Sequence, residues 1–156
     1  MTATPGTRFA GRNVLVTGSS GLAASAAHTI AADGGSVFVV SRTAGHAEAL
    51  AAEVRDAGGR CDGATADLRL EGDVDAAFAA FDAAFGRLDA VYGVAGISAR
   101  RFGDGPVHEA TLEGWEAVVA ANATSQFLVA RAAVRRMLAQ APDAAGQRGS
   151  VVLMSS

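Results

Sequence analysis

The sequence predicts an α/β protein with a doubly wound parallel sheet, built as a single domain over residues 1–156. Short apolar runs alternate five times with segments of helical periodicity, and several of these helical segments end at glycine. The apolar runs are also continuous rather than alternating, which indicates strands covered on both faces of the sheet. Regular strand–helix alternation is typical of parallel strands joined by right-handed crossovers.

The expected elements follow one another without a linker, an internal repeat or a low-complexity segment. The strands are expected at residues 13–17, 36–41, 60–66, 90–95 and 149–155. Four helices are expected. The first covers residues 21–33, the second includes residues 47–54 and ends at the glycines at 58 and 59, the third covers residues 73–86, and the fourth runs from 111 to about 140. Asp73 and Thr111 are the expected N-caps of the last two helices, because their side chains can accept hydrogen bonds from the first helical turn. The sheet is predicted to be truncated after its fifth strand.

Composition narrows the class of protein. Half of the residues are hydrophobic and 19% are charged, so a folded domain is expected. The formal net charge of −3 and the lack of any basic run disfavour nucleic acid and anionic membrane surfaces as partners. Neither a membrane-spanning apolar stretch nor a signal-like segment is found, and the one cysteine, Cys61, is expected to be a buried thiol in a reducing cytoplasm. The three histidines lack metal-ligand spacing, so no metal site is predicted.

One edge of the predicted sheet is expected to bind ligands. In doubly wound sheets, ligands bind beyond the carboxyl ends of the strands, where the strand order reverses. The segments that follow the first four strands are expected to lie there: residues 17–22, Ser41-Arg42, Asp67-Leu68 and Ala95-Gly96.

The turn after the first strand has the composition of a phosphate-binding loop. It reads Thr17-Gly18-Ser19-Ser20-Gly21-Leu22. The two glycines permit unusual dihedral angles and let an anion approach the backbone, and the two serines add hydroxyl donors. The free N–H groups and the dipole at the start of the helix favour the same ligand. The alternative is a tight turn that binds nothing.

Two further segments on this edge indicate which nucleotide would bind. Arg42, 24 residues after Gly18, is the first charged residue after the second strand. An acidic residue there would bind a ribose hydroxyl and favour NAD, whereas an arginine can pair with a 2′-phosphate and favours NADP. The alternative is a solvated arginine at the start of a loop. Asp67-Leu68 can meet an adenine edge, or Asp67 can simply cap a turn.

Asn122 is an unusual residue for its position in the long helix. It falls on a predicted apolar stripe made by Trp115, Val118, Val119, Ala130, Ala133 and Met137. A buried amide needs hydrogen-bond partners, so Asn122 is either a structural residue or a member of a polar site. The sequence leaves both interpretations open.

Taken together, these motifs resemble the short-chain dehydrogenase/reductase family. The resemblance rests on five segments in the right order: residues 17–24, Asp67-Leu68, residues 88–97, Asn122 with Phe127, and residues 149–156. It implies a Rossmann-type oxidoreductase that passes hydride between NADP(H), or less favourably NAD(H), and a small carbonyl or alcohol substrate. It also implies that Thr17–Leu22, Arg42, Asp67, Leu68, Ala95 and Gly96 contact the cofactor. Asn122 would hold a water in the proton relay, and Ser156 would orient the substrate oxygen.

Three departures from the family pattern affect these expectations. Ala23-Ala24 stands where a third glycine is expected in the loop, and Gly93-Val94 replaces an Asn-Asn pair whose side chains brace the centre of the sheet. The family's acid/base pair is a Tyr-x-x-x-Lys segment, but the only tyrosine is Tyr92 and the chain has no lysine. The chain therefore resembles the N-terminal part of such an enzyme, or a degenerate relative.

Three functional hypotheses follow. The first is the cofactor-binding portion of an NADP-dependent reductase, the second a non-catalytic nucleotide-binding or sensing module, and the third a structural remnant that binds nothing. Without further strands, the fifth strand is an apolar edge and part of the long helix lacks cover, so a homo-oligomer is also expected.

Overall fold

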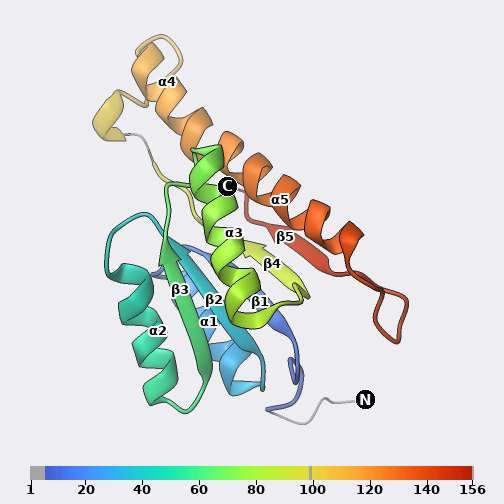
Figure 1. Cartoon of the computed structure of the whole chain (residues 1–156). Helices are drawn as coiled ribbons and strands as arrows, with labels where there is room; N and C mark the ends of the chain where they lie inside the picture. Colours follow the sequence, from blue (N-terminus) through green and yellow to red (C-terminus); the bar gives the residue numbers. More distant parts are fainter. Residues whose placement is uncertain (1–5, 99, 156) are drawn as a thin grey trace.

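The computed structural model describes residues 6–98 and 100–155, and its centre is a parallel sheet of five strands (Figure 1). The strands are β1 (Asn13–Thr17), β2 (Ser36–Ser41), β3 (Arg60–Thr65), β4 (Ala90–Gly93) and β5 (Ser150–Leu153). Their order across the sheet is β3-β2-β1-β4-β5. The predicted fold class is confirmed, and all five strands lie within the predicted ranges.

The strand order reverses at β1. Val14 of β1 pairs with Val37 of β2 on one side and with Ala90 of β4 on the other. The chain runs outward from β1 through β2 to β3, and then returns to the other side of β1 to form β4 and β5. A crevice opens at the carboxyl ends of the strands where the order reverses in this way.

Helices cover both faces of the sheet. The helical elements are α1 (Leu22–Ala32), α2 (His46–Asp56), α3 (Glu71–Phe85), the 3-10 turn η1 (Arg100–Phe102), α4 (Leu112–Val118), the π-helical segment η2 (Val119–Thr124) and α5 (Ser125–Ala139). One hydrophobic cluster lies between the sheet and α1 with α2, and a second lies between the sheet and α3 with α5. The α4 end of the long helix projects beyond the sheet (Figure 1).

The central strands are apolar throughout because each face of the sheet has its own core. Val14 and Val16 belong to the cluster under α1 and α2, whereas Leu15 between them belongs to the cluster under α3 and α5. All three side chains are at most 2% exposed. Successive side chains of a strand point to opposite faces, so a strand buried on both faces shows no polar alternation.

The third helix begins earlier than predicted. Its first residue is Glu71 and its N-cap is Leu70, so the prediction that Asp73 caps this helix was wrong. Asp73 instead lies in the first turn, where its Oδ2 accepts a hydrogen bond from the backbone N–H of Asp67 at 2.8 Å. The carboxylate thus closes the loop before the helix, and the helix dipole favours its charge there.

The long helix starts as predicted but does not keep one phase. The Oγ1 of Thr111 accepts the N–H of Gly114 at 3.0 Å, which confirms the predicted N-cap. The segment η2 then interrupts the α-helix with π-helical turns, which hold more residues per turn and rotate the faces before and after it. Met137 of the predicted stripe is buried against the sheet, whereas Trp115 lies in α4, which projects beyond the sheet (Figure 1), and is 66% exposed.

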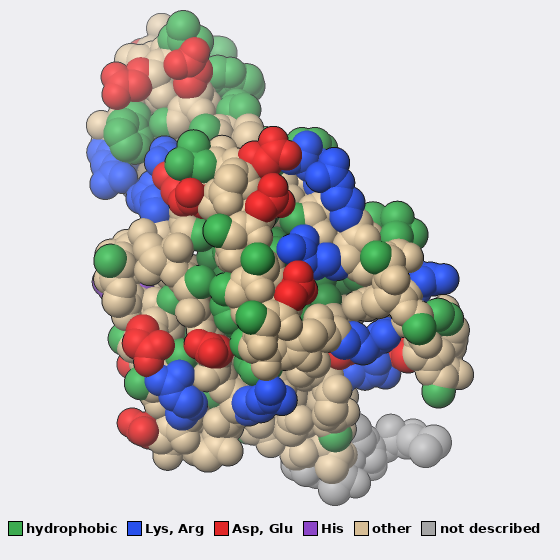
Figure 2. All heavy atoms as spheres, viewed as in Figure 1, with side chains coloured by type: hydrophobic (Ala, Val, Ile, Leu, Met, Phe, Trp, Pro, Cys, Tyr) green, Lys and Arg blue, Asp and Glu red, His purple; other side chains and the backbone are tan. Residues whose placement is uncertain are grey.

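Apolar side chains remain exposed on the outer helix and at the edge strand. Figure 2 shows hydrophobic and arginine side chains along the outer side of the long helix. Within the described residues, the exposed large hydrophobic side chains in this half of the chain are Val107, Leu112, Trp115, Phe127, Val134, Leu138, Val152, Leu153 and Met154. Leu112–Ala139 is also long and apolar enough to cross a membrane by length and composition alone, although a buried core helix meets the same criterion. The α5 part of this helix is such a core helix, since it packs on the sheet.

Candidate functional site

A cleft of about 250 Å³ lies at the carboxyl ends of β1, β2 and β3, beside the segment that continues β4. Nine of the residues predicted for this edge line it: Gly18, Ser19, Ser20, Ser41, Arg42, Asp67, Leu68, Ala95 and Gly96. We call it the first cleft. The fold therefore brings together four segments that are far apart in the sequence, as the sheet topology predicts.

The loop after β1 presents backbone donors at this cleft. The N–H of Gly18 donates a hydrogen bond to the carbonyl of Val40 at 2.8 Å. In the described part of the chain, the N–H groups of residues 19–22 make no hydrogen bond. Gly21, the N-cap of α1, has a φ of 55°, and a Cβ placed on it would meet no atom within 4 Å. Free N–H groups at an open helix start fit an anionic diphosphate.

Alanine at position 23 is compatible with this loop. A Cβ on Gly18 would lie 3.1 Å from the Cβ of Ala23, and Gly18 has a φ of 101°. Ala23 is 1% exposed, so its methyl group fills the space that the missing Cβ of Gly18 leaves. The loop therefore closes tightly on α1 although the expected third glycine is replaced.

Three hydroxyl groups of this region form hydrogen bonds within the protein. The Oγ1 of Thr17 accepts the N–H groups of Val94 and Ala95, both at 3.0 Å, and so ties β1 to the end of β4. Thr17 is 1% exposed and does not line the first cleft. The hydroxyls of Ser19 and Ser41 lie 3.0 Å apart and tie the loop to β2. Cofactor contacts by these side chains remain predictions.

Arg42 and Asp67 lie in the same cleft but are held differently. Arg42 is exposed and, among the described residues, makes no hydrogen bond or ion pair. Asp67 accepts a hydrogen bond from Nε of Arg69 at 2.8 Å and one from the N–H of Arg69 at 3.1 Å. The side-chain hydrogen bond from Arg69 is the main cause that lowers the pKa of Asp67 below its ordinary value of 3.8. The turn-cap interpretation of Asp67 is therefore correct, and its carboxylate still reaches the cleft.

Several lining residues were not predicted. Thr43, His46 and Arg69 also line the first cleft. Arg69 directly follows Asp67-Leu68, and His46 lies four residues after Arg42, so proximity in sequence to a predicted residue was the available signal. A single sequence gives no sign of which neighbours of a loop residue turn toward the cleft.

A second cleft, of about 810 Å³, adjoins the first. The two clefts share Ala95, Gly96 and Ile97 as a common wall. The second cleft is further lined by Leu22, Val94, Ser98, Asp104, Val118, Asn122, Gln126, Leu153, Met154 and Ser155. Asn122 and the end of β5 are thus brought to one cavity, as the resemblance implies, while Ser156 lies outside the described residues.

Asn122 is held firmly by the shared wall. Its Oδ1 accepts the N–H of Ile97 at 2.8 Å, and its Nδ2 donates to the carbonyl of Ile97 at 2.9 Å. The residue lies in the π-helical segment η2, and π-helical turns are common at functional sites. Asn122 therefore has a structural hydrogen-bonding role and also borders the second cleft, so its two interpretations do not exclude each other.

The end of β4 is braced although the expected asparagines are missing. The Nε2 of Gln126 donates to the carbonyls of Gly93 at 3.2 Å and Ala95 at 3.3 Å. Gly93-Val94 lacks the side-chain hydrogen bonds of an Asn-Asn pair, as expected, but the segment is not left without bracing. A glutamine from α5 reaches the strand and supplies it.

The described residues offer neither a metal site nor a tyrosine at the clefts. No group of three or more His, Cys, Asp or Glu side chains in the described part of the chain is placed to hold a metal ion. Tyr92, the only tyrosine of the sequence, packs against the core under α1 and α2 and lines neither cleft.

Comparison with known proteins identifies the family. Residues 12–156 match the family model described as short chain dehydrogenase, so the chain belongs to this family of oxidoreductases. It is similar to the D-threitol dehydrogenase of Mycolicibacterium smegmatis, with 35% identity over 150 residues that make up 96% of this chain and 54% of that protein. The chain thus spans about half the length of this relative.

Solved structures agree with the fold and with the cofactor class. The citronellol catabolism dehydrogenase of Pseudomonas aeruginosa PAO1 superimposes with a TM-score of 0.84 at 29% identity, covering 99% of this chain and 59% of that chain. A 3-ketoacyl-(acyl-carrier-protein) reductase from Brucella melitensis, described as complexed with NADH, gives a TM-score of 0.74 at 29% identity, with 82% and 50% covered. The Brucella melitensis neighbour is thus a protein of this fold with a nicotinamide dinucleotide bound.

Proposed function

We propose that this chain forms the cofactor-binding part of an NADP-dependent oxidoreductase that interconverts a carbonyl and an alcohol. The observation that carries the proposal is the position of Arg42. It lies at the first cleft, directly after β2, and within the described residues its guanidinium is not committed to any hydrogen bond or ion pair. An arginine in this place can make charge-assisted hydrogen bonds to a 2′-phosphate.

The first cleft offers binding groups for the adenosine half and the diphosphate of NADP. The free N–H groups of residues 19–22 would hold the diphosphate at the start of α1, and Arg42 would hold the ribose phosphate. Leu68, which is 9% exposed, and Asp67 would border the adenine. When bound, the nicotinamide supplies or accepts the hydride. The wall at Ala95–Ile97 separates the two clefts and would direct the reactive end into the second one.

The second cleft would receive the carbonyl or alcohol substrate. Its lining combines apolar side chains with four polar residues, Ser98, Asn122, Gln126 and Ser155, and one charged residue, Asp104. Asn122 keeps the wall in place through both polar groups of Ile97. The proton that accompanies hydride transfer needs an acid/base group, and no side chain that lines the described clefts is a tyrosine or lysine.

This last observation favours a second candidate function, a nucleotide-binding or sensing module without turnover. Both candidates predict cofactor binding, and they differ in catalysis. The test uses the complete protein from its natural source: binding of NADPH without oxidation of it in the presence of a panel of ketones and aldehydes would support the module.

The proposal is tested by titrating the purified chain with NADPH and NADH and following nucleotide fluorescence. The wild-type chain is expected to bind NADPH more tightly than NADH. Arg42→Asp should weaken NADPH binding about 10- to 100-fold, because it replaces a charged hydrogen bond to the 2′-phosphate with a repulsive carboxylate. NADH binding should remain nearly unchanged, because NADH has no 2′-phosphate.

A matched control separates this effect from net charge. Arg135→Asp makes the same charge change on the exposed side of α5, away from both clefts. It should leave both affinities unchanged. Equal loss of NADPH binding in the two variants would contradict the role of Arg42, and a wild-type chain that binds neither nucleotide would contradict the proposal as a whole.

A further inference from the structure

Two amide side chains on one helix hold the wall that the two clefts share. Asn122 in η2 binds both backbone polar groups of Ile97, and Gln126, one turn later, donates to the carbonyls of Gly93 and Ala95. The side chains thus reach residues 93, 95 and 97 in turn. On the opposite side, Thr17 accepts the N–H groups of Val94 and Ala95. Strand pairing ends with the hydrogen bond from the N–H of Met154 to the carbonyl of Gly93 at 2.8 Å, and side chains hold the segment beyond it from both sides.

The space for Gln126 depends on glycine at position 93. A Cβ placed on Gly93 would lie 2.4 Å from Oε1 of Gln126 and 2.8 Å from a methyl group of Leu153. Gly93 is not among the residues with a positive φ, so the backbone itself would accept another residue. The glycine is required by the packing of the Gln126 amide.

Within the part of the chain that the structure describes, the Gln126 amide leaves one of its polar atoms buried without a hydrogen-bond partner. Its Oε1 is buried and has no hydrogen-bond partner among the described residues, where it is the only side-chain polar atom in that condition. A buried acceptor without a partner destabilises a fold. An apolar side chain would avoid this penalty, so the presence of glutamine points to a use for its two hydrogen bonds beyond general stability.

We propose that Gln126 is a positioning residue for cofactor binding, acting through the Ala95–Ile97 wall. Its amide shares the carbonyl of Gly93 with the N–H of Met154 and also binds the carbonyl of Ala95, the first of the three residues that border both clefts. The bond to Ala95 links the wall to α5. This inference rests on the proposed function, because it concerns the affinity of the same nucleotide site.

The chain provides a matched control for this role. Gln140, the C-cap of α5, makes the corresponding bridge to the start of the same strand segment: its Nε2 donates to the carbonyl of Leu88 at 2.7 Å and its Oε1 accepts the N–H of Leu88 at 3.2 Å. Its Nε2 also donates to the carbonyl of Arg148. Gln140 lines neither cleft. Gln126→Ala and Gln140→Ala therefore each remove a glutamine bridge between α5 and the β4 segment, at the cleft end and at the far end.

The first measurement is the Kd for NADPH of the full chain and of both variants. Gln126→Ala should raise the Kd about 5- to 10-fold, because the wall is free to shift, and Gln140→Ala should leave it unchanged. The second measurement is hydrogen exchange of the Ile97 amide without nucleotide. It should become about tenfold faster in Gln126→Ala and remain as in wild type in Gln140→Ala.

A rescue variant distinguishes positioning from general packing. In Gln126→Ala, the space of the lost amide is open to a side chain at position 93, so the double variant Gly93→Asn, Gln126→Ala returns an amide to the same place from the strand. The exposed end of Leu153 can move aside. The double variant should recover NADPH affinity to within about threefold of wild type.

Each result bears on the proposal. Unchanged NADPH affinity in Gln126→Ala, equal losses in Gln126→Ala and Gln140→Ala, or no recovery in the double variant would overturn it. If the wild-type chain binds no nucleotide, the proposed function fails. The exchange rate of Ile97 is measured without nucleotide, so it then decides separately whether Gln126 positions the wall.

Discussion

The side-chain oxygen of Asn122 lies where it would be 2.7 Å from a Cβ on Gly96. Glycine at position 96 therefore lets the amide reach the backbone of Ile97, the next residue, and make two hydrogen bonds to it. Gly96 has no positive φ, so space rather than backbone conformation requires the glycine. The pair formed by Gly93 and Gln126 repeats the same relationship one helical turn away.

Gly96→Ala is predicted to break the contact between Asn122 and Ile97. The new methyl group must displace the Asn122 amide, and overpacking of this kind typically lowers the free energy of unfolding by about 1–3 kcal/mol. Denaturant unfolding of the two proteins measures the loss. A hydrogen-exchange measurement on the same two proteins should also show faster exchange of the Ile97 amide in Gly96→Ala, because its N–H loses its acceptor.

Gly72→Ala is the control for this substitution. Gly72 lies in α3, and a Cβ there would meet no atom within 4 Å. Alanine is expected to stabilise this helix by about 0.5–1 kcal/mol, since it has less conformational entropy to lose. A Gly96→Ala protein as stable as wild type would show that the wall adjusts without cost.

The fold could be read from the sequence because its signals are local. The apolar run of β1, the glycines that end helices and the Thr111 cap each depend on a few neighbouring residues, and the strand order follows from general rules for crossovers. The predicted edge also gathered Gly18, Arg42 and Asp67 at one cleft, because parallel strands place their carboxyl ends together.

The details of the site could not be read in this way because they depend on contacts between distant residues. Gln126 and Gln140 look like ordinary polar positions of an amphipathic helix, and only the packed structure shows that they reach the backbone of the β4 segment. The π-helical turns of η2, which place Asn122 beside Ile97, also have no local signal in the sequence. Asp73 was misassigned because a carboxylate in the first turn resembles an N-cap.

The spacing of the amide bridges explains how one helix can hold both ends of the segment. Asn122 and Gln140 are 18 residues apart, about 27 Å along a helix at about 1.5 Å per residue. Their partners Ile97 and Leu88 are nine residues apart, about 30 Å along an extended chain at about 3.3 Å per residue. The two lengths are similar, so side chains from one helical stretch can reach both ends of the segment.

Cys61 is predicted to be unreactive in the folded protein. The thiol is 5% exposed, and its burial raises the pKa from an ordinary value of 9.0 to about 12. At pH 8 a thiol reagent should therefore label it only after unfolding, because the thiolate is the reactive form.

The same shift has a consequence for stability at high pH. The folded state holds the thiol proton more tightly than the unfolded state, so this contribution to stability is fully present below pH 9 and is lost as the pH rises toward 12. Cys61→Ala should reduce the slope of stability against pH in this range, measured by denaturant unfolding. Rapid labelling of the native protein would contradict the buried thiol.

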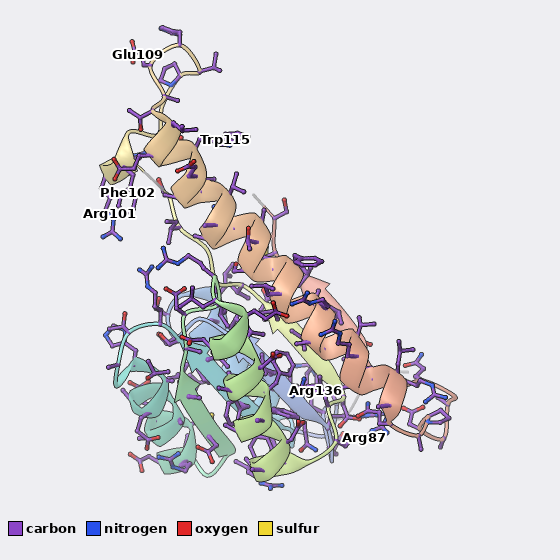
Figure 3. The ribbon with its side chains drawn as sticks, turned by 45° about the horizontal axis from the view of Figure 1, so that its top comes forward. Arg87, Arg101, Phe102, Glu109, Trp115 and Arg136 are labelled. Carbon is purple, nitrogen blue, oxygen red and sulfur yellow. The ribbon has the colours of Figure 1, made fainter. Side chains whose placement is uncertain are left out.

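The outer face of the long helix is predicted to form contacts between copies of the chain. Trp115 projects from α4 away from the sheet (Figure 3), and Phe127, Val134 and Leu138 are exposed further along the same helix. Single exposed apolar residues are common on protein surfaces, but several together with the apolar edge of β5 favour association. We therefore expect the purified chain to be a homo-oligomer in sizing chromatography.

Trp115 gives this prediction a direct readout, because it is the only tryptophan in the chain. If the helix face is the contact, its emission should shift toward longer wavelength on dilution as the indole becomes solvated. Trp115→Glu should then yield a monomer, since a carboxylate at the contact must lose its hydration. As a matched control, Val107→Glu adds the same charge at a 93% exposed position before α4 and should leave the oligomer intact.

A wild-type chain that elutes as a monomer at all concentrations would contradict the prediction. An oligomer that survives Trp115→Glu would instead place the contact at the free edge of β5, whose exposed Val152 and Leu153 are the other apolar surface of this half of the molecule.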